Sequence, residues 1–521
     1  MSVSRVNPEL LRNLRIQLRP RKMIAAAAIC AAISLSTIAF YLHGHQAGST
    51  DPDLLKSVLL MQLLALLVGG GIYCIQSVHT EKDQNTFDYQ RLTPMSPLRL
   101  AVGKLFGAPA LAYFVVLCLM PTAFIGAHFA RIGIVPFLEC YLIVSLGCIT
   151  YHSLALLISL FLVRGSSAGG IIFYLILAWL GSVDMISPSG SLAIHTLGPA
   201  FGYTLLDPHS GADGSDRIFV INPLRDQFYG LSVAHVWVLI LLYGAFTSWF
   251  LLAVARNLKR DPSAYEIFSP AQGFGFAMFT NSLLLGFFPW RPMVYEFMIG
   301  GRLVVPRPTP PGEAEAAVLG FSLPIFAILG LSLLRNREGV RRRIIGVGER
   351  AKGWLAAFWP APYMLAGVLI TGYALLELIR HKLPKSDDWS LGTGLFIVAV
   401  FALWLSRDVL YLQWMNLRRS KHPLVISVLF MIVFYSCSGA LLAAFDLFTN
   451  KDAPFAAALV PGIILAPLKY SEWVAQRGAW IAGAILIAAQ AFLFAALQRR
   501  ELRKLAAASA ISSAGQASPS S

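Results

Sequence analysis

The stretch EKDQNTFDYQRLTPMSPLRLAVGKLFGAPA, from Glu81 to Ala110, carries charges of both signs and three prolines between two apolar segments. Residues 54–75 before it and 105–129 after it are each predominantly apolar over about 20 residues, the length at which an α-helix crosses roughly 30 Å of hydrocarbon. This stretch, called the connecting stretch below, is therefore predicted to join two membrane-spanning helices at a membrane face.

The composition indicates a membrane protein over the whole chain. Of the 521 residues, 56% are hydrophobic and 13% are charged, whereas soluble domains carry about 25% charged residues. The mean hydropathy is +0.64. We therefore predict an all-α polytopic membrane protein that is surrounded by the lipid bilayer.

The net charge of +15 has two possible explanations. In a soluble protein it would indicate a nucleic-acid partner, whereas in a membrane protein Lys and Arg accumulate in the cytoplasmic loops. With the spans assigned below, most Lys and Arg fall on one face. No basic patch is interleaved with exposed aromatic residues, as it is in DNA- and RNA-binding proteins, so no nucleic-acid partner is predicted.

The first half of the chain, residues 1–260, is predicted to hold six spans. Residues 7–20 place leucines at helical spacing with arginines between them, a pattern typical of an amphipathic helix on the cytoplasmic surface. Gly198 and Pro199 interrupt a further apolar segment within residues 184–230, so a re-entrant segment is expected there on the outer face. The predicted spans cover residues 23–42, 54–75, 105–129, 134–163, 168–183 and 231–255.

The second half, residues 261–504, is predicted to hold six more spans, which gives about twelve crossings with both termini in the cytoplasm. The apolar segment 454–468 contains three prolines and is predicted to be re-entrant, because a full crossing would place the basic RRELRK sequence outside. Residues 335–353 and 406–423 are predicted inner loops, and 505–521 a disordered tail. The predicted spans cover residues 271–289, 317–334, 362–378, 391–405, 424–448 and 475–497.

Several motifs for nucleotide binding and hydrolysis are missing from the sequence. GxxxxGK[ST], HExxH and SxxK do not occur, so the chain itself is not expected to be an enzyme. The six cysteines lie in apolar segments without CxxC or Cys–His spacing, so neither a metal site nor a cofactor is predicted. Glu139 and Glu377, near span ends, and His152, deeper in a span, are interpreted as structural residues.

Within the connecting stretch, the prolines predict two short helices separated by a turn. Asn85 or Thr86 can cap the first helix, and Pro94 must end it. A turn over residues 93–97 follows, and the second helix is expected to begin near Leu98.

The second helix is predicted to present Arg99 and Lys104 to water. Gly103, Gly107 and Ala110 fall at i, i+4 and i+7 and form a face of small residues suited to close helix packing, with a kink expected at Pro109. A helix, a rigid turn and a second helix form either a lever that passes a push from a cytoplasmic partner into the third span, or an ordinary amphipathic connector.

The connecting stretch resembles the segment between the second and third spans of type-two ABC transporter permeases. Members of that family share five features in this segment: a Glu-rich start, a Gly-Thr pair, a helix, an L-x-P-x-S-P turn and a Gly-Lys-hydrophobic-x-Gly sequence where the third span begins. Asn85 stands where the family usually has glycine, and asparagine also tolerates positive φ. The matching positions are Glu81, Thr86, Leu92, Pro94, Ser96, Pro97, Gly103, Lys104 and Gly107.

The resemblance implies that the chain is the transmembrane subunit of an ATP-driven ABC exporter in the bacterial inner (plasma) membrane, with two permease halves fused in one chain. It would form the translocation pathway, and a separate cytoplasmic ABC ATPase would hydrolyse ATP. That ATPase would dock on the coupling stretch, residues 78–104, with the residues Glu81, Thr86, Leu92, Pro94, Ser96, Pro97 and Lys104.

Two alternatives stay open at this stage. The second-half counterpart of the coupling stretch is 335–353 by span count, which we favour, or 406–423 by its aromatic and basic pattern, and neither loop reproduces the Ser-Pro turn. The alternative function is a polytopic membrane scaffold or an accessory factor in envelope assembly, without an ATPase partner. The sequence does not indicate a substrate.

Overall fold

The structure is a computed structural model of the whole chain, and it divides into two compact units, residues 1–267 and 268–521. Each unit is described by itself. The residues that the structure describes are 7–44, 53–162, 170–172, 174–175, 225–229, 231–260, 265–288, 297–299, 302–304, 311–335, 337, 340, 354–383, 390–418, 426–427, 429–431, 433–434 and 477–516.

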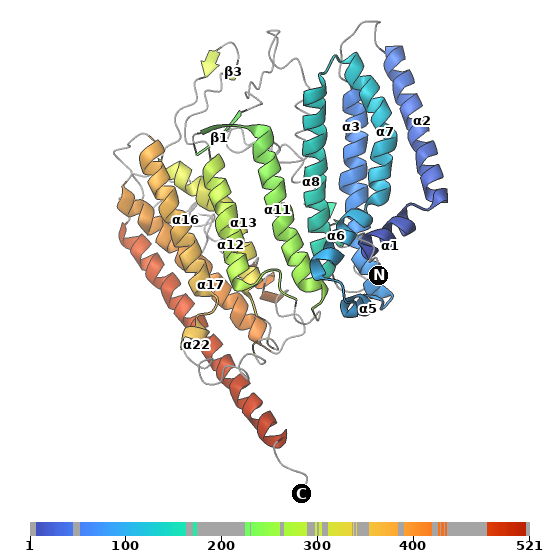
Figure 1. Cartoon of the computed structure of the whole chain (residues 1–521). Coiled ribbons are helices and arrows are strands. Elements are labelled where there is room, and N and C mark those ends of the chain that lie inside the picture. The colour runs from blue at the N-terminus through green and yellow to red at the C-terminus, as the bar shows by residue number, and fades with distance from the viewer. Residues whose placement is uncertain are drawn as a thin grey trace. The chain divides into compact units, whose positions relative to one another are not determined.

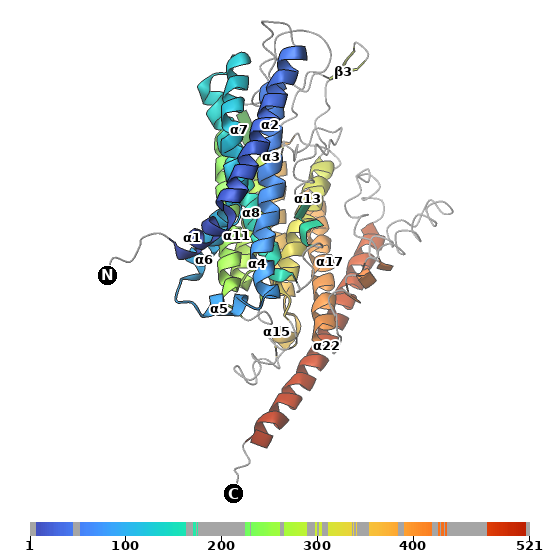
Figure 2. The same cartoon turned by 90° about the vertical axis from the view of Figure 1, so that its right-hand side faces the viewer.

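The first unit is a bundle of long helices with short helices at one end (Figure 1). Helices α2, α3, α7, α8 and α11 run along the bundle, and α1, α5 and α6 gather at the end that is called the α5 end below, as Figure 2 also shows. The elements are α1 (Pro8–Gln17), α2 (Pro20–Gly44), α3 (Asp53–Leu64), the π-helix η1 (Ala65–Gly70), α4 (Gly71–Asp83), α5 (Phe87–Leu92), α6 (Pro97–Gly107), α7 (Ala110–Phe129), α8 (Ile134–Phe161), β1 (Arg225–Phe228), β2 (Leu231–Ala234) and α11 (His235–Leu258).

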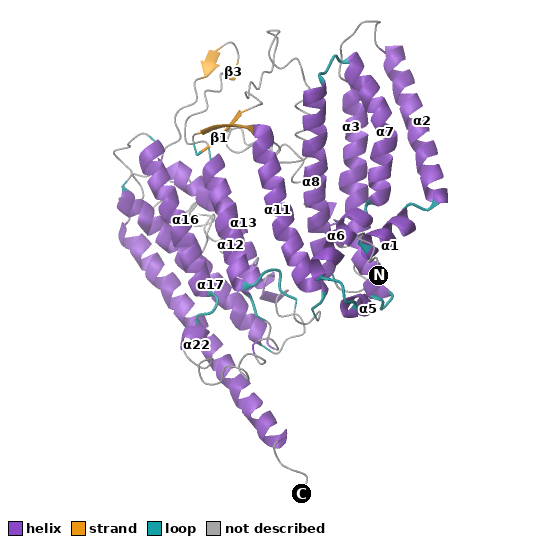
Figure 3. Cartoon of the chain, viewed as in Figure 1, coloured by secondary structure: helices purple, strands orange, loops and turns teal. Residues whose placement is uncertain are grey.

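The second unit is also helical, and within the described part of the chain each unit carries one short antiparallel hairpin (Figure 3). In the first unit Arg225 pairs with Ala234, and in the second Phe297 pairs with Val304. The elements of the second unit are α12 (Pro270–Phe287), β3 (Phe297–Ile299), β4 (Arg302–Val304), α13 (Pro311–Leu333), α15 (Trp354–Ala357), α16 (Ala361–Lys382), α17 (Leu391–Leu417) and α22 (Arg477–Gln516).

The prediction of an all-α polytopic membrane protein is confirmed, with the two small hairpins as the exceptions. Among the described residues, eight helices are long and apolar enough to cross a bilayer, and Ala317–Leu333 is a shorter apolar helix. The predicted spans 168–183 and 424–448 and the two re-entrant segments, within 184–230 and at 454–468, lie largely or wholly outside the described residues. The eight candidate spans are Pro20–His43, Asp53–Asp83, Ala110–Phe129, Ile134–Phe161, Val236–Leu258, Ala361–Lys382, Leu391–Leu417 and Ile481–Ala508.

The prediction that the span beginning at residue 391 ends before Ser406 is wrong. Helix α17 continues to Leu417, through most of the segment predicted as the loop 406–423. Arg407 is only 3% exposed and donates from Nε and Nη2 to Oδ1 of the neighbouring Asp408, at 2.9 and 2.6 Å. Because the two charges compensate each other, they can be buried within a helix instead of ending it.

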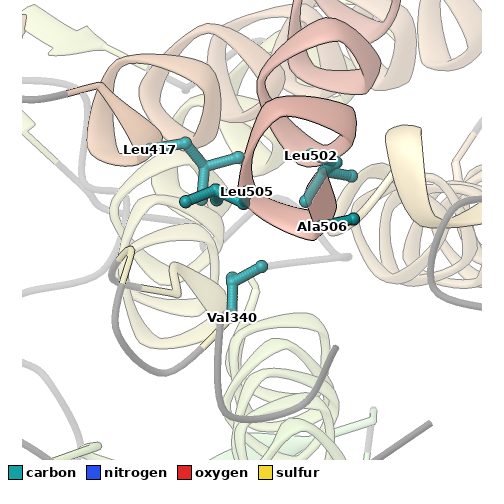
Figure 4. Close-up of a cluster of buried hydrophobic side chains, with 5 residues drawn as sticks. All are labelled: Val340, Leu417, Leu502, Leu505 and Ala506. Atoms are coloured by element: carbon teal, nitrogen blue, oxygen red, sulfur yellow. The ribbon is translucent and has the colours of Figure 1, made fainter. Parts of the chain in front are cut away.

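The prediction of a disordered tail from residue 505 is wrong as far as Gln516, because helix α22 continues to that residue. Its 40 residues correspond to about 60 Å at 1.5 Å per residue, roughly twice the hydrocarbon thickness. Close to the predicted end, Leu502, Leu505 and Ala506 pack against Leu417 of α17 and Val340 (Figure 4). This buried apolar face explains why the helix extends beyond its basic RRELRK segment.

Candidate functional site

The first turn of the connecting stretch is built around an asparagine with left-handed backbone. Helix α4 ends at Asp83, and Asn85 has a φ of 57°. Asparagine adopts this region at lower cost than most residues, so it replaces the expected glycine here. The backbone N–H of Thr86 donates to the carbonyl of Glu81 (2.9 Å), as does its hydroxyl (3.3 Å), so the Thr86 side chain does not cap α5.

The second turn is set by Ser96 and the prolines on either side of it. Helix α5 ends at Leu92, two residues before Pro94. The Ser96 hydroxyl then accepts from the backbone N–H of Arg99 (3.3 Å), and Pro97 occupies the first position of α6, where its missing N–H costs nothing. Pro94 and Ser96 are exposed, so this turn lies on the surface of the α5 end.

The prediction that Lys104 faces water is wrong, because its side chain is 0% exposed. Its Nζ lies 2.6 Å from Oε2 of Glu81 at the end of α4 and 3.2 Å from Oε1 of Glu9 in α1. Arg12 also pairs with Glu81, and Gln90 of α5 donates to it. These five residues, called the Glu81 cluster below, join α1, α4, α5 and α6.

Glycines explain how α1 approaches α6 closely enough to bury Lys104. A Cβ built on Gly103 would lie 2.8 Å from Cβ of Glu9, and one on Gly107 would lie 2.7 Å from Cβ of Asn13. Both distances are shorter than real Cβ contacts, so the two glycines form the surface on which α1 lies. Ala110, the third small residue of the predicted face, is 4% exposed and begins the next helix, α7, after a break at Pro109.

Sequence reasoning placed the N-terminal helix but missed its contribution to the site. Asn7 caps α1 by accepting from the backbone N–H of Glu9 (3.1 Å), and its side-chain amide donates to the carbonyl of Arg99 (2.5 Å). Asn13 donates to Oε1 of Glu9 at 2.9 Å. The Asn-Pro-Glu start is a helix signal that the sequence does show, but nothing local indicates that Glu9 faces Lys104.

Two further lysines that sequence reasoning missed tie the connecting stretch to neighbouring spans. Nζ of Lys82 donates to three carbonyls at the end of α8, those of Ser159 (3.0 Å), Leu160 (2.6 Å) and Leu162 (3.1 Å). A cation at this position also interacts favourably with the negative end of the helix dipole. Lys259, just after α11, donates to the carbonyl of Thr93 (2.6 Å) in the turn.

The α5 end also exposes large apolar side chains. Tyr89 is 76% exposed, Leu92 is 83% exposed and Leu98 is 55% exposed. All three belong to α5 and α6 beside the Thr93–Pro97 turn, beyond the end of the candidate span Asp53–Asp83. Apolar groups gathered at a helix end beyond a span are suited to burial against another protein.

The fold is that of a multi-pass membrane protein, and a family match makes it one of transporter permease type. Residues 15–181 match the family model described as ABC-2 family transporter protein. The match covers the connecting stretch and lies entirely within the first unit, over less than half of the chain. No curated protein and no solved structure matches the chain.

Proposed function

We propose that the chain is the transmembrane subunit of an ATP-driven ABC exporter and that a separate cytoplasmic ABC ATPase docks on the α5 end. The observation that carries the proposal is the Glu81 cluster, in which a fully buried Lys104 ties the exposed turn to the second span. On this proposal the α5 end is cytoplasmic, both termini lie on that side, and the membrane is the bacterial inner membrane.

The contacts around the turn support its use as a lever. Displacing the turn relative to α4 would separate Lys104 from Glu81, which is costly because each charge would be left buried without its partner. The same motion would pull on the carbonyls held by Lys82 and Lys259. A push on Leu92 or Pro94 is therefore expected to move α4, α6 and the ends of α8 and α11 as one unit.

The second unit is proposed to be a second permease half fused to the first. Its long helices α16, α17 and α22 are candidate spans, and two helices, α12 and α13, precede them. Both units would then line the translocation pathway, and ATP hydrolysis would reside in the partner alone.

The proposal is tested by affinity purification of the full chain from its native membrane. We expect an ATPase with a Walker A motif to be recovered with it, and the purified chain alone to show no ATP hydrolysis. The variant Lys104→Gln should abolish stimulation of the partner's ATPase activity by the chain, whereas Lys22→Gln, at an exposed lysine, should not. Repeated recovery of no ATPase would instead favour a membrane scaffold or an envelope-assembly factor.

A further inference from the structure

The second span contains a π-helical turn at its middle. Residues Asp53–Asp83 form one candidate span, and Ala65–Gly70 within it are π-helical. A π turn holds more residues than an α turn and pairs each N–H with the carbonyl five residues earlier, so the regular ladder of the helix is interrupted. Interruptions of this kind are where helices bend.

Side chains from other helices bind the carbonyls of this turn. Nε2 of His152, in α8, lies 2.8 Å from the carbonyl of Leu66, and the hydroxyl of Tyr174 donates to the carbonyl of Leu67 at 2.6 Å. Because a carbonyl oxygen can only accept, Nε2 of His152 carries the proton, and Nδ1 accepts from the hydroxyl of Tyr113 at 3.1 Å. His152 and Tyr174 are both 0% exposed.

Two glycines make room for these side chains. A Cβ on Gly70 would lie 2.3 Å from Nε2 of His152, and a Cβ on Gly71 would lie 2.3 Å from the ring of Tyr174. Gly69, their neighbour, has no atom within 4 Å of the position of a Cβ. Close approach therefore requires glycine at two of the three positions and leaves the third free.

We infer that the Ala65–Gly70 turn is a joint at which the inner half of the second span moves relative to the outer half, and that His152 and Tyr174 are positioning residues that hold it. The inference rests on the proposed function, because the inner half ends in Glu81 and Lys82, the residues that receive the push. Converting the π turn to α-helix would rotate the residues beyond it by about 100° around the helix axis.

This rotation would separate the groups that the observed state joins. Glu81 would turn away from Lys104, and Lys82 would leave the carbonyls of α8. The hydrogen bonds to Leu66 and Leu67 and the Glu81 cluster therefore stabilise the same state of the second span, from its middle and from its end. A joint placed there converts movement of the coupling residues into movement of a helix within the membrane.

The joint is tested first on the purified chain alone, by hydrogen exchange measured by mass spectrometry on peptides from residues 53–83. Amides that follow the π turn should exchange faster than those of α3. His152→Leu removes the donor to Leu66 and should accelerate their exchange roughly threefold to tenfold, as expected for one lost interhelical hydrogen bond. His152→Gln retains a side-chain N–H, so exchange of these amides should stay at the wild-type rate.

The glycines supply a matched pair of variants. Gly70→Ala should accelerate exchange as His152→Leu does, because its Cβ displaces the imidazole, whereas Gly69→Ala should leave exchange unchanged. Tyr174→Phe, which keeps the ring and loses only the hydroxyl, tests the site without a clash. Equal exchange in Gly70→Ala, Tyr174→Phe and Gly69→Ala would overturn the inference.

A second measurement separates a joint from a merely structural contact. In the complex with its ATPase, trapping with ATP and vanadate should change exchange in residues 66–83 of the wild type and of Gly69→Ala and His152→Gln. The change should be lost in Gly70→Ala and His152→Leu. Failure to recover an ATPase would contradict the proposed function, and the exchange measured on the chain alone would still test whether the π turn is a joint. If an ATPase is recovered but trapping leaves exchange in the wild-type chain unchanged, only the joint is contradicted.

Discussion

The two units bury charge in different ways. In the first, the partners of Lys104 come from other helices, because Glu81 lies in the last turn of α4 and Glu9 lies in α1. In the second, Arg407 donates to the adjacent residue Asp408 on the same helix and to Gln490 of α22 (3.0 Å). The first arrangement joins different helices through ion pairs, whereas the second mainly neutralises a charge within one helix.

Among the described residues of the second unit, side-chain amides also link separate segments. The amide of Gln413 in α17 accepts from the backbone N–H of Arg335 (2.8 Å) and donates to its carbonyl (2.9 Å), and Asn416 donates to the same carbonyl (3.1 Å). The guanidinium of Arg335 lies 3.5 Å from the ring centroid of Trp359. We therefore propose that the first unit receives the push and that the second serves mainly as its counterpart in the membrane.

The largest expected effect on stability comes from Glu81→Gln, which leaves Lys104 buried with only Glu9 nearby. Removing one member of a buried ion pair costs about 3–5 kcal/mol, and the remaining Glu9 places the change toward the lower value. The free energy of unfolding, from SDS titration in mixed micelles, measures it. The control Glu501→Gln, at an exposed pair with Lys504, should change stability by less than about 1 kcal/mol.

Asp408→Asn extends this test to the second unit. It leaves the buried Arg407 without its carboxylate, so a loss of stability of similar size is expected. Stimulation of the partner ATPase, however, should fall in Glu81→Gln and persist in Asp408→Asn when both are assayed at a temperature where they are folded. Loss in both variants would show that the two units share the coupling role.

The local features of the site were predictable from the sequence, and its long-range pairing was not. Pro94, Ser96 and Pro97 predict the turn, because proline and a capping serine act on the backbone beside them. The burial of Lys104 depends on α1, which lies far away in the chain, and on glycines that allow α1 to approach. The residues next to Lys104 in the sequence do not indicate that another helix buries its side chain.

The same distinction explains the error at Ser406. Charged residues after an apolar run usually mark the end of a span, but Asp408 neutralises Arg407 at the next position. Burial of an ion pair depends on the surrounding helices, here α17 with α22, and hydropathy averaged along the sequence does not contain that information.

A smaller loss of stability than in the two charge variants is expected for Gly103→Ala, because the new Cβ meets backbone-proximal atoms of α1. Its neighbour at 2.8 Å is Cβ of Glu9, which cannot move without moving the helix. Overpacking of this kind costs about 1–3 kcal/mol. Gly133→Ala is the matched control, since its Cβ would make only ordinary contact at 3.7 Å with Pro136. Equal unfolding free energies for the two variants would contradict close packing of α1 on α6.

A smaller effect, expected to be equal in both units, comes from removing helix caps. Ser96 caps α6 in the first unit and Ser269 caps α12 in the second, each accepting from a backbone N–H at 3.3 Å. Replacement of either serine by alanine should cost about 1 kcal/mol. Only Ser96→Ala should also reduce ATPase stimulation, because only that cap lies in the turn on which we propose that the ATPase docks. A reduction by Ser269→Ala would place a second coupling surface in the second unit.

The smallest expected effect on stability is that of Pro94→Ala, at an exposed residue whose ring mainly restricts the unfolded chain. The cost should be about 0.4–1 kcal/mol, with unchanged expression. Its effect on coupling should nevertheless be large, because a flexible turn absorbs a push instead of passing it to α6. Pro136→Ala, at an exposed proline in the first turn of α8, is the control. If Pro94→Ala and Pro97→Ala stimulate the ATPase as the wild type does, the turn is an ordinary connector and not a lever.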